Sequence, residues 1–168
     1  MRVQELIGIV AAAALVVTAA VVAPAAAETV ERDDRRGDAP ASIDVVHATY
    51  SHTHSRVRVV VRVPDLGRGG VADLSISRFE LFELGYVLRI TNRPGQPPRT
   101  QLLFFNHFDL EPRRCAAIAG SWTRGVIRMS VARTCLVGHA EEDVFAQFGI
   151  RHGRNVDRVS AVRRLHRS

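Results

Sequence analysis

Residues 56–63 read RVRVVVRV, an almost unbroken alternation of arginine and valine. In an extended chain successive side chains point to opposite sides, so Val57, Val59, Val61 and Val63 would share one face. Arginine would dominate the other face. Such alternation is typical of a β-strand with one buried side and one solvent-facing side. The next residues, Pro64–Gly70, are rich in turn formers and end the strand. This stretch therefore predicts a sheet that covers a core with valine and presents arginine to solvent.

The same two-residue period recurs at intervals of roughly ten to fifteen residues. We expect further strands at Ile43–His47, Val71–Leu84 (one bent strand or two short ones), Tyr86–Thr91, Thr100–Phe105, Arg113–Ile118, Ile127–Val131 and Val144–Ile150. A helix competes over residues 140–148, but the alternation there favours a strand. About eight short strands joined by Gly- and Pro-rich turns predict an all-β fold. We expect an antiparallel β-sandwich, jelly-roll or immunoglobulin-like, with a barrel as the alternative.

The first residues have the parts of a secretory signal peptide. Arg2 precedes an apolar run rich in alanine and valine, and the run ends in Pro24-Ala25-Ala26-Ala27. Ala25 and Ala27 fit the −3 and −1 positions of a cleavage site, so we expect residues 1–27 to be removed after Ala27. A retained membrane anchor is the alternative, because the run is nearly long enough to cross a bilayer. The alanine-rich composition favours cleavage, which predicts a secreted protein of the cell envelope with no membrane span in the mature chain.

Two segments follow the expected cleavage site. Residues 28–41, ETVERDDRRGDAPA, are charged and almost without apolar side chains, which predicts a flexible charged leader. Residues 42–168 are expected to form the β-sandwich domain, and about 140 residues in all are enough for one core. The basic tail, residues 155–168, could be ordered only by docking onto the sheet.

The chain has two cysteines, Cys115 and Cys135. An even number of cysteines in an exported protein is typical of a disulfide. Closing a loop of about twenty residues would stabilise the fold by ~3 kcal/mol on the chain-entropy model. A reactive thiol or a metal-ligand pair is the alternative, but the chain has no Cys-x-x-Cys motif.

The chain is basic, with a formal net charge of +6, and a basic exported protein is attracted to anionic surfaces. Arg56, Arg58 and Arg62 would form a basic stripe on the outer face of their strand, and they are the candidate binding residues. The partner would be an anionic cell-wall polymer or a glycan. The alternative is that these arginines only keep the sheet soluble. Nucleic acid is not expected, because the arginines lie among valines and not among aromatic residues.

Three short motifs carry a resemblance: RRGDAPASID at residues 35–44, VPDL at residues 63–66 and GVIRMSVARTCL at residues 125–136. Together with the signal peptide, they resemble small secreted actinobacterial proteins of unknown function. In that family the SV-x-R-x-CL pattern typically carries the second cysteine of a pair, here Cys135. The resemblance implies a secreted β-sandwich with one disulfide and no assigned activity. This chain departs from the family at residues 90–96, ITNRPGQ, where relatives often have an Asp-x-Asp turn.

His52 and His54 are spaced so that both side chains would lie on one face of a strand. A His-x-His pair can supply two ligands to zinc or copper, although a catalytic zinc site usually needs three. The pair also lies between two alternating segments and among Ser51, Thr53 and Ser55, where a hairpin turn belongs. We favour the turn, with the metal pair and a pH-responsive surface as alternatives.

Other candidate residues are weaker. Trp122, in AGSWTRG, could stack on a sugar or could cap the core. Asp109 and Glu111 could share a face beside His107, or they could belong to a loop. The chain has no Gly-x-Ser-x-Gly motif and no phosphate-binding loop.

These patterns predict a monomeric, non-enzymatic binding module with no cofactor and no catalytic residues. A metal-dependent enzyme or metal carrier that uses His52 and His54 is one alternative. A purely structural envelope protein is another.

Overall fold

A computed structural model describes residues 28–79, 83–107, 109–138 and 143–167. This part of the chain contains no α-helix. It forms strands β1 (Glu28–Asp33), β2 (His47–His52), β3 (Arg56–Arg62), β4 (Gly70–Arg78), β5 (Leu84–Asn92), β6 (Arg99–Asn106), β7 (Asp109–Arg113), β8 (Ile118–Thr123), β9 (Val126–Ala132), β10 (Val144–His152), β11 (Asn155–Arg158) and β12 (Val162–Leu165), and a short 3-10 helix at Arg133–Cys135.

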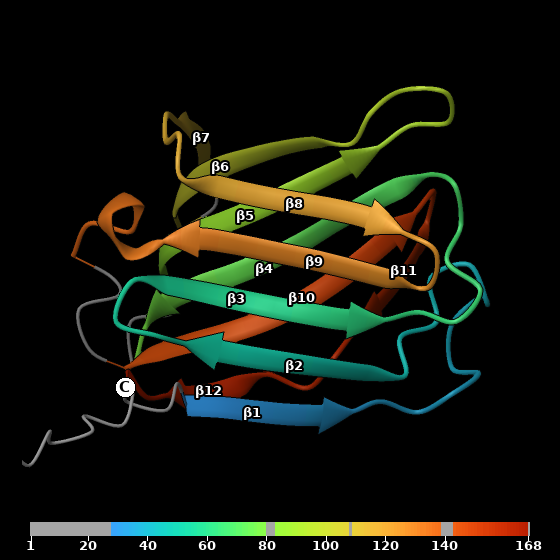
Figure 1. The fold of residues 1–168 in the computed structure, drawn as a ribbon, viewed down its shortest axis with the longest axis horizontal. Coiled ribbons are helices and arrows are strands. Elements are labelled where there is room, and N and C mark those ends of the chain that lie inside the picture. The colour runs from blue at the N-terminus through green and yellow to red at the C-terminus, as the bar shows by residue number, and fades with distance from the viewer. Residues whose placement is uncertain (1–27, 80–82, 108, 139–142, 168) are drawn as a thin grey trace, which may run out of the picture.

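The strands form two antiparallel sheets that stack face to face (Figure 1). Sheet A has the order β1-β2-β3-β9-β8. Sheet B has the order β11-β10-β4-β5-β6-β7, and β12 also pairs with β10. The predicted all-β sandwich is therefore confirmed. No helix among the described residues is long and apolar enough to cross a membrane.

The core lies between the sheets and is built by the alternation that the sequence shows. In β3 every second residue is buried, and Val57, Val59 and Val61 face inward as predicted. In β10 the alternating residues Val144, Ala146, Phe148 and Ile150 are buried in the same way. Burying one face of each strand removes apolar area from water, which is the main force that holds two sheets together.

The predicted disulfide is confirmed, because Cys115 is bonded to Cys135. Cys115 lies in the connection between β7 and β8, and Cys135 ends the 3-10 helix after β9. The bond therefore ties two connections together at one end of the sandwich. The strand expected at residues 113–118 is wrong, because β7 ends at Arg113 and β8 begins at Ile118.

The charged segment after the expected cleavage site differs from the prediction. Residues 28–33 are not a flexible leader but form β1, which pairs with β2 along its whole length. The pattern analysis missed this strand because an edge strand can be charged on its exposed side and needs few apolar residues. Ala27 and the expected signal peptide, residues 1–27, lie outside the described residues.

The basic tail does dock onto the sheet, since β11 and β12 both pair with β10. With β1 and the tail counted, the described residues hold more strands than the eight expected. Residues 140–142, part of the segment where a helix competed, lie outside the description, but Val144–His152 is the predicted strand.

Candidate functional site

The outer face of sheet A carries four arginines, which we call the arginine face: Arg56, Arg58, Arg62 and Arg128. The first three alternate along β3 opposite the buried valines. Arg128 comes from β9, where it lies between the buried residues Ile127 and Met129. Strand pairing places Arg128 opposite Val60 of β3. Along the strand direction, Arg128 therefore lies between the positions of Arg58 and Arg62. The four side chains therefore leave the same side of two neighbouring strands.

Arg56 is held in place, whereas the other three arginines have no side-chain hydrogen bond or ion pair to any described residue. Nε of Arg56 donates to Oγ of Ser130 at 2.6 Å, and its Nη2 donates to the carbonyl of Ala117 at 3.0 Å. Within the described residues, no hydrogen bond or ion pair reaches the guanidinium groups of Arg58, Arg62 or Arg128, and all three residues are exposed. Their charges are available to an external anion.

Two shallow depressions lie on this face, one on each side of Val60, which is 41% exposed. The first, about 500 Å³, lies between Arg58 and Arg128 and is floored by small residues such as Ala119 and Ser130. The second, about 580 Å³, lies between Arg128 and Arg62 and extends to Thr49 of β2. Short side chains next to long arginines leave room in which a phosphate or carboxylate group could sit between two guanidinium groups.

The negative charges on this face lie at its edge. Asp33 of β1 contacts His47 at 2.8 Å and lines the far side of the second depression. Glu31 lies on the same edge strand. The positive charges of the face are therefore on β3 and β9, and the negative charges are on the edge strand β1. On a strand that rises about 3.4 Å per residue, Arg58 and Arg62 lie roughly 14 Å apart along the chain, which suits a ligand with repeated charges.

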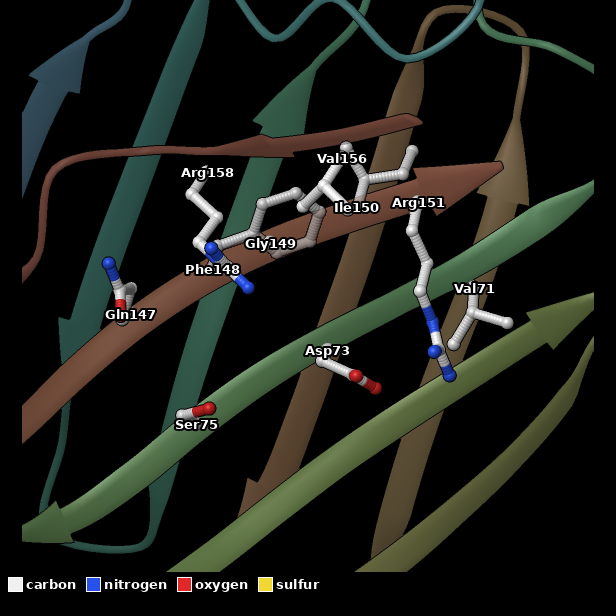
Figure 2. Close-up of a pocket in the computed structure, with 10 residues that line it drawn as sticks. All are labelled: Val71, Asp73, Ser75, Gln147, Phe148, Gly149, Ile150, Arg151, Val156 and Arg158. Carbon is white, nitrogen blue, oxygen red and sulfur yellow. The ribbon is translucent and has the colours of Figure 1, made fainter. Parts of the chain in front are cut away.

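A smaller hollow, about 290 Å³, lies on the outer face of sheet B (Figure 2). Gly149 of β10 leaves a gap there, and Arg151 and Arg158 stand at its sides. Asp73 also lines the hollow, but Arg89 holds its carboxylate through two hydrogen bonds of 2.7 and 2.8 Å. This ion pair raises the pKa of Arg89, mainly through the hydrogen bond to Asp73. The hollow therefore mixes charges of both signs and is a weaker anion site than the arginine face.

The two histidines do not come together. His52 ends β2 and is fully buried, with Nδ1 3.4 Å from the carbonyl oxygen of Leu165. His54 is exposed in the turn between β2 and β3, where Thr53 N–H donates to the carbonyl of Arg56. A hairpin turn is present, but it is shorter than predicted, because Ser51 and His52 belong to β2 and only residues 53–55 connect it to β3. His52 is therefore buried in a strand and does not lie in a solvated turn. The two imidazoles do not share one strand face, because β2 ends between them. The two-residue spacing puts side chains on one face only while the strand continues.

Trp122 caps the core. It is half-buried and packs against the core cluster, and its Nε1 donates to the carbonyl of Gly67 at 2.8 Å. Its ring lies beside Gly70, where an added Cβ would come within 3.1 Å of the indole. This placement argues against the predicted sugar-stacking role.

Asp109 and Glu111 lie in the exposed edge strand β7, not in a loop. Glu111 pairs with Arg113 at 2.8 Å, and His107 lies 3.2 Å from Glu83. These are ion pairs between exposed side chains.

The sequence analysis named Arg56, Arg58 and Arg62 but missed Arg128 as a fourth member. A signal for it was present, because Arg128 alternates with Ile127 and Met129 in the same way as the arginines of β3. Only the pairing of β3 with β9 places it on the same face. Comparison with known protein families, with curated proteins and with solved structures finds no match to this chain.

Proposed function

We propose that this protein is an exported binding module without enzymatic activity, which holds an anionic polymer of the cell envelope on its arginine face. The observation that carries the proposal is the set of unpartnered guanidinium groups of Arg58, Arg62 and Arg128 around two adjoining depressions. Arginine presents several donors in a planar fork and binds phosphate and carboxylate groups well. The exposed Val60 between them gives the ligand's carbon skeleton an apolar contact.

One further feature supports export. The disulfide Cys115–Cys135 belongs in an oxidising compartment. Mass spectrometry of the protein recovered from culture medium and cell wall tests this part. A chain that begins at or near Glu28 supports export, and an uncleaved chain in the membrane contradicts it.

The binding test compares two triple variants with the same change in net charge. Arg58→Ser/Arg62→Ser/Arg128→Ser removes the unpartnered cations of the arginine face. Arg93→Ser/Arg154→Ser/Arg163→Ser removes three exposed arginines from other parts of the surface. Retention on purified cell wall is measured at increasing salt, with polyphosphate and poly-glutamate as defined phosphate and carboxylate probes.

We expect the arginine-face variant to bind roughly threefold to a hundredfold more weakly, because it loses three exposed charge contacts and each contributes roughly 0.2–1 kcal/mol. Its binding should also depend less on salt, because fewer charges are screened. The control variant should keep most of the affinity. Equal losses in the two variants would show that only net charge matters and would contradict a defined site.

A purely structural envelope protein is the second candidate function. It is favoured if the wild-type protein is cleaved and located in the envelope but binds neither the wall nor the two probes at low salt. The metal-dependent alternative has no support, because His52 is buried in the core and His54 is exposed in the turn.

A further inference from the structure

The arginine face is a ladder of charges that runs along β3 and β9. Residues that are directly paired across the two strands lie at one level of this ladder. Arg56, Arg58 and Arg62 occupy three levels. Arg128 is paired with Val60 and supplies the level between the last two, so four successive levels carry one arginine each. Neighbouring levels are two residues apart, which separates them by about 7 Å along the strands.

Acidic side chains of the same sheet lie parallel to the ladder, two strands away (Figure 1). Glu31 and Asp33 of β1 are both exposed. Pairing through β2 places Glu31 at the level of Arg128, and it places Asp33 at the level of Arg62. Adjacent strands are about 4.8 Å apart, so these acids lie roughly 10 Å from β3. A flat anionic surface, such as a membrane, would meet both signs of charge. A narrow ligand can lie on the ladder alone, with its long axis parallel to the strands.

The ladder offers mainly hydrogen-bond donors. A guanidinium group donates through five N–H bonds and accepts none. Hydroxyl groups of Thr49, Ser121 and Ser130 line the two depressions beside the arginines and can donate as well. The residues of β2, β3, β8 and β9 are all described, and their outer sides carry no Phe, Tyr or Trp, because Tyr50 is buried and Trp122 packs against the core. The face therefore suits a ligand that carries acceptors and needs no ring to stack on.

An acidic peptide fits the same face less well. β3 is paired on both sides, with β2 and β9, and β9 is paired on both sides, with β3 and β8. The backbone groups of these two strands are therefore already used within sheet A. A peptide gains backbone hydrogen bonds from a sheet by adding a strand at an open edge, and on this face it would gain none. A phosphodiester chain has no N–H group to satisfy and presents only acceptor oxygens to the guanidinium groups.

We propose that the ligand of the arginine face is a linear phosphodiester polymer with linkers of three carbon atoms, which lies along β3 and β9 with one phosphate at each level. This assignment rests on the proposed function and names the class of ligand. Three backbone bonds of an extended chain span about 3.5 Å, so the six bonds between successive phosphorus atoms span about 7 Å, the distance between levels. The carbon linker passes over Val60, which is 41% exposed. Single-stranded nucleic acid has the same phosphate spacing, but its bases would find no stacking side chain on this face.

The first test measures how tightly synthetic oligomers bind the full mature chain at low salt, by fluorescence anisotropy. Two oligomers carry four phosphates each and differ only in their linkers, which are 1,3-propanediol or 1,6-hexanediol. A peptide with four glutamates at alternate positions has nearly the spacing of the propanediol oligomer. We expect the propanediol oligomer to bind at least about threefold more tightly than the other two probes, because only it places one phosphate at each level without strain and without an unused backbone. Equal binding of the two oligomers, or tighter binding of the peptide, would overturn the assignment.

The second test moves one charge between levels. Arg128→Ser removes the charge of one level. Val60→Arg in that background returns a charge to the same level, because Val60 is paired with Arg128. Thr123→Arg in that background places the charge at the level of Arg62 instead, since Thr123 and Arg62 are both paired with Val126. The two double variants have the net charge of the wild type, and both new side chains replace exposed residues.

Arg128→Ser should bind the propanediol oligomer about twofold to fivefold more weakly, the effect of one exposed charge contact. Val60→Arg should restore the affinity, and Thr123→Arg should not. Equal recovery in the two double variants would show that only net charge matters and would overturn the ladder, as would no recovery with Val60→Arg. Urea unfolding of each variant confirms that it is folded.

The ligand class and the proposed function can fail separately. If none of the three probes binds, but retention on cell wall still depends on the arginine face, the phosphodiester ligand is wrong and the proposed function stands. If retention on cell wall is the same for the wild type and for Arg58→Ser/Arg62→Ser/Arg128→Ser, the proposed function fails and the ligand class fails with it.

Discussion

The hydroxyl oxygen of Tyr50 accepts a hydrogen bond of 3.0 Å from the backbone N–H of Phe148, and this bond joins the two sheets through the core. Tyr50 belongs to β2 and Phe148 to β10, and both side chains are fully buried. On one edge, β10 pairs with β12 as far as Ala146 and with β11 from Gly149 onward. Neither β11 nor β12 therefore pairs with Phe148 on that edge. The tyrosine side chain supplies the partner that the sheet lacks.

Tyr50→Phe should lower the free energy of unfolding by about 1–3 kcal/mol, because it leaves a buried N–H without an acceptor. Urea unfolding of the two proteins measures the difference. Thr123→Val is the control, since it removes an exposed hydroxyl whose bond to the Val126 carbonyl water can replace. That change should stay within about 0.5 kcal/mol. A Tyr50→Phe protein as stable as the wild type would mean that Phe148 N–H finds another partner.

The same tyrosine should stay protonated at every pH at which the fold is stable. Burial raises the pKa of Tyr50 to about 12, partly offset by the Phe148 hydrogen bond. Between the ordinary pKa of tyrosine, 10.0, and about 12, the unfolded chain loses the proton while the folded chain keeps it, so stability falls as pH rises through that window. Tyr50→Phe should lack this alkaline loss, which unfolding midpoints measured between about pH 9 and pH 11 would detect.

Removal of the disulfide should destabilise the protein by about 2–5 kcal/mol. Cys115→Ala/Cys135→Ala opens a loop with a sequence separation of 20 residues, so the unfolded chain gains freedom that the bond had removed. Unfolding of the wild type in reducing agent should give a similar loss. A double variant that unfolds at the wild-type urea midpoint would contradict a stabilising role for the bond.

Gly120 of β8 lies directly against side chains of sheet B. A Cβ at this position would collide with Oγ1 of Thr100 and lie 2.7 Å from Cδ1 of Ile90. Gly120→Ala should therefore cost about 1–3 kcal/mol, because sheet B must move or its side chains must leave their preferred rotamers. Ala119→Val, on the exposed side of the same strand, adds volume toward solvent and should be tolerated. Equal stability of the two variants would contradict the close contact.

The carboxyl groups of Asp34 and Asp157, which lie near Asp38 and Asp44, predict an unusual pH dependence of stability. Burial is the main cause that raises the pKa of Asp34 and of Asp157 above 3.8. Between 3.8 and the raised pKa the folded state binds more protons than the unfolded state, so their contribution to stability is lost as pH rises through that window. Asp34→Asn removes part of this loss, and its stability relative to wild type should increase from pH 4 to pH 7.

Unfolding of both proteins by urea across that pH range makes the measurement. An advantage for the variant that is greatest at pH 4 and disappears toward pH 7 would contradict the raised pKa of Asp34.

Local alternation was enough to predict several parts of the fold. The valines of β3 face the core and its arginines face outward because the side-chain period of a strand is two, whatever its neighbours are. A turn before Arg56 was predicted in the same way, from short polar residues between two alternating segments, although Ser51 and His52 belong to β2 and not to the turn. The disulfide needed only the number of cysteines and the expected compartment.

The tertiary structure decided which distant residues meet. Arg128 joins Arg58 and Arg62 only because β9 pairs with β3, and such pairing depends on the packing of the whole chain. The same holds for β1, whose charged sequence gave no strand signal but whose backbone completes an edge. Asp44 and Asp157 meet only when the tail docks onto β10. A sequence pattern reports which face a residue prefers, but contacts across the sandwich arise from packing between segments that are far apart in the chain.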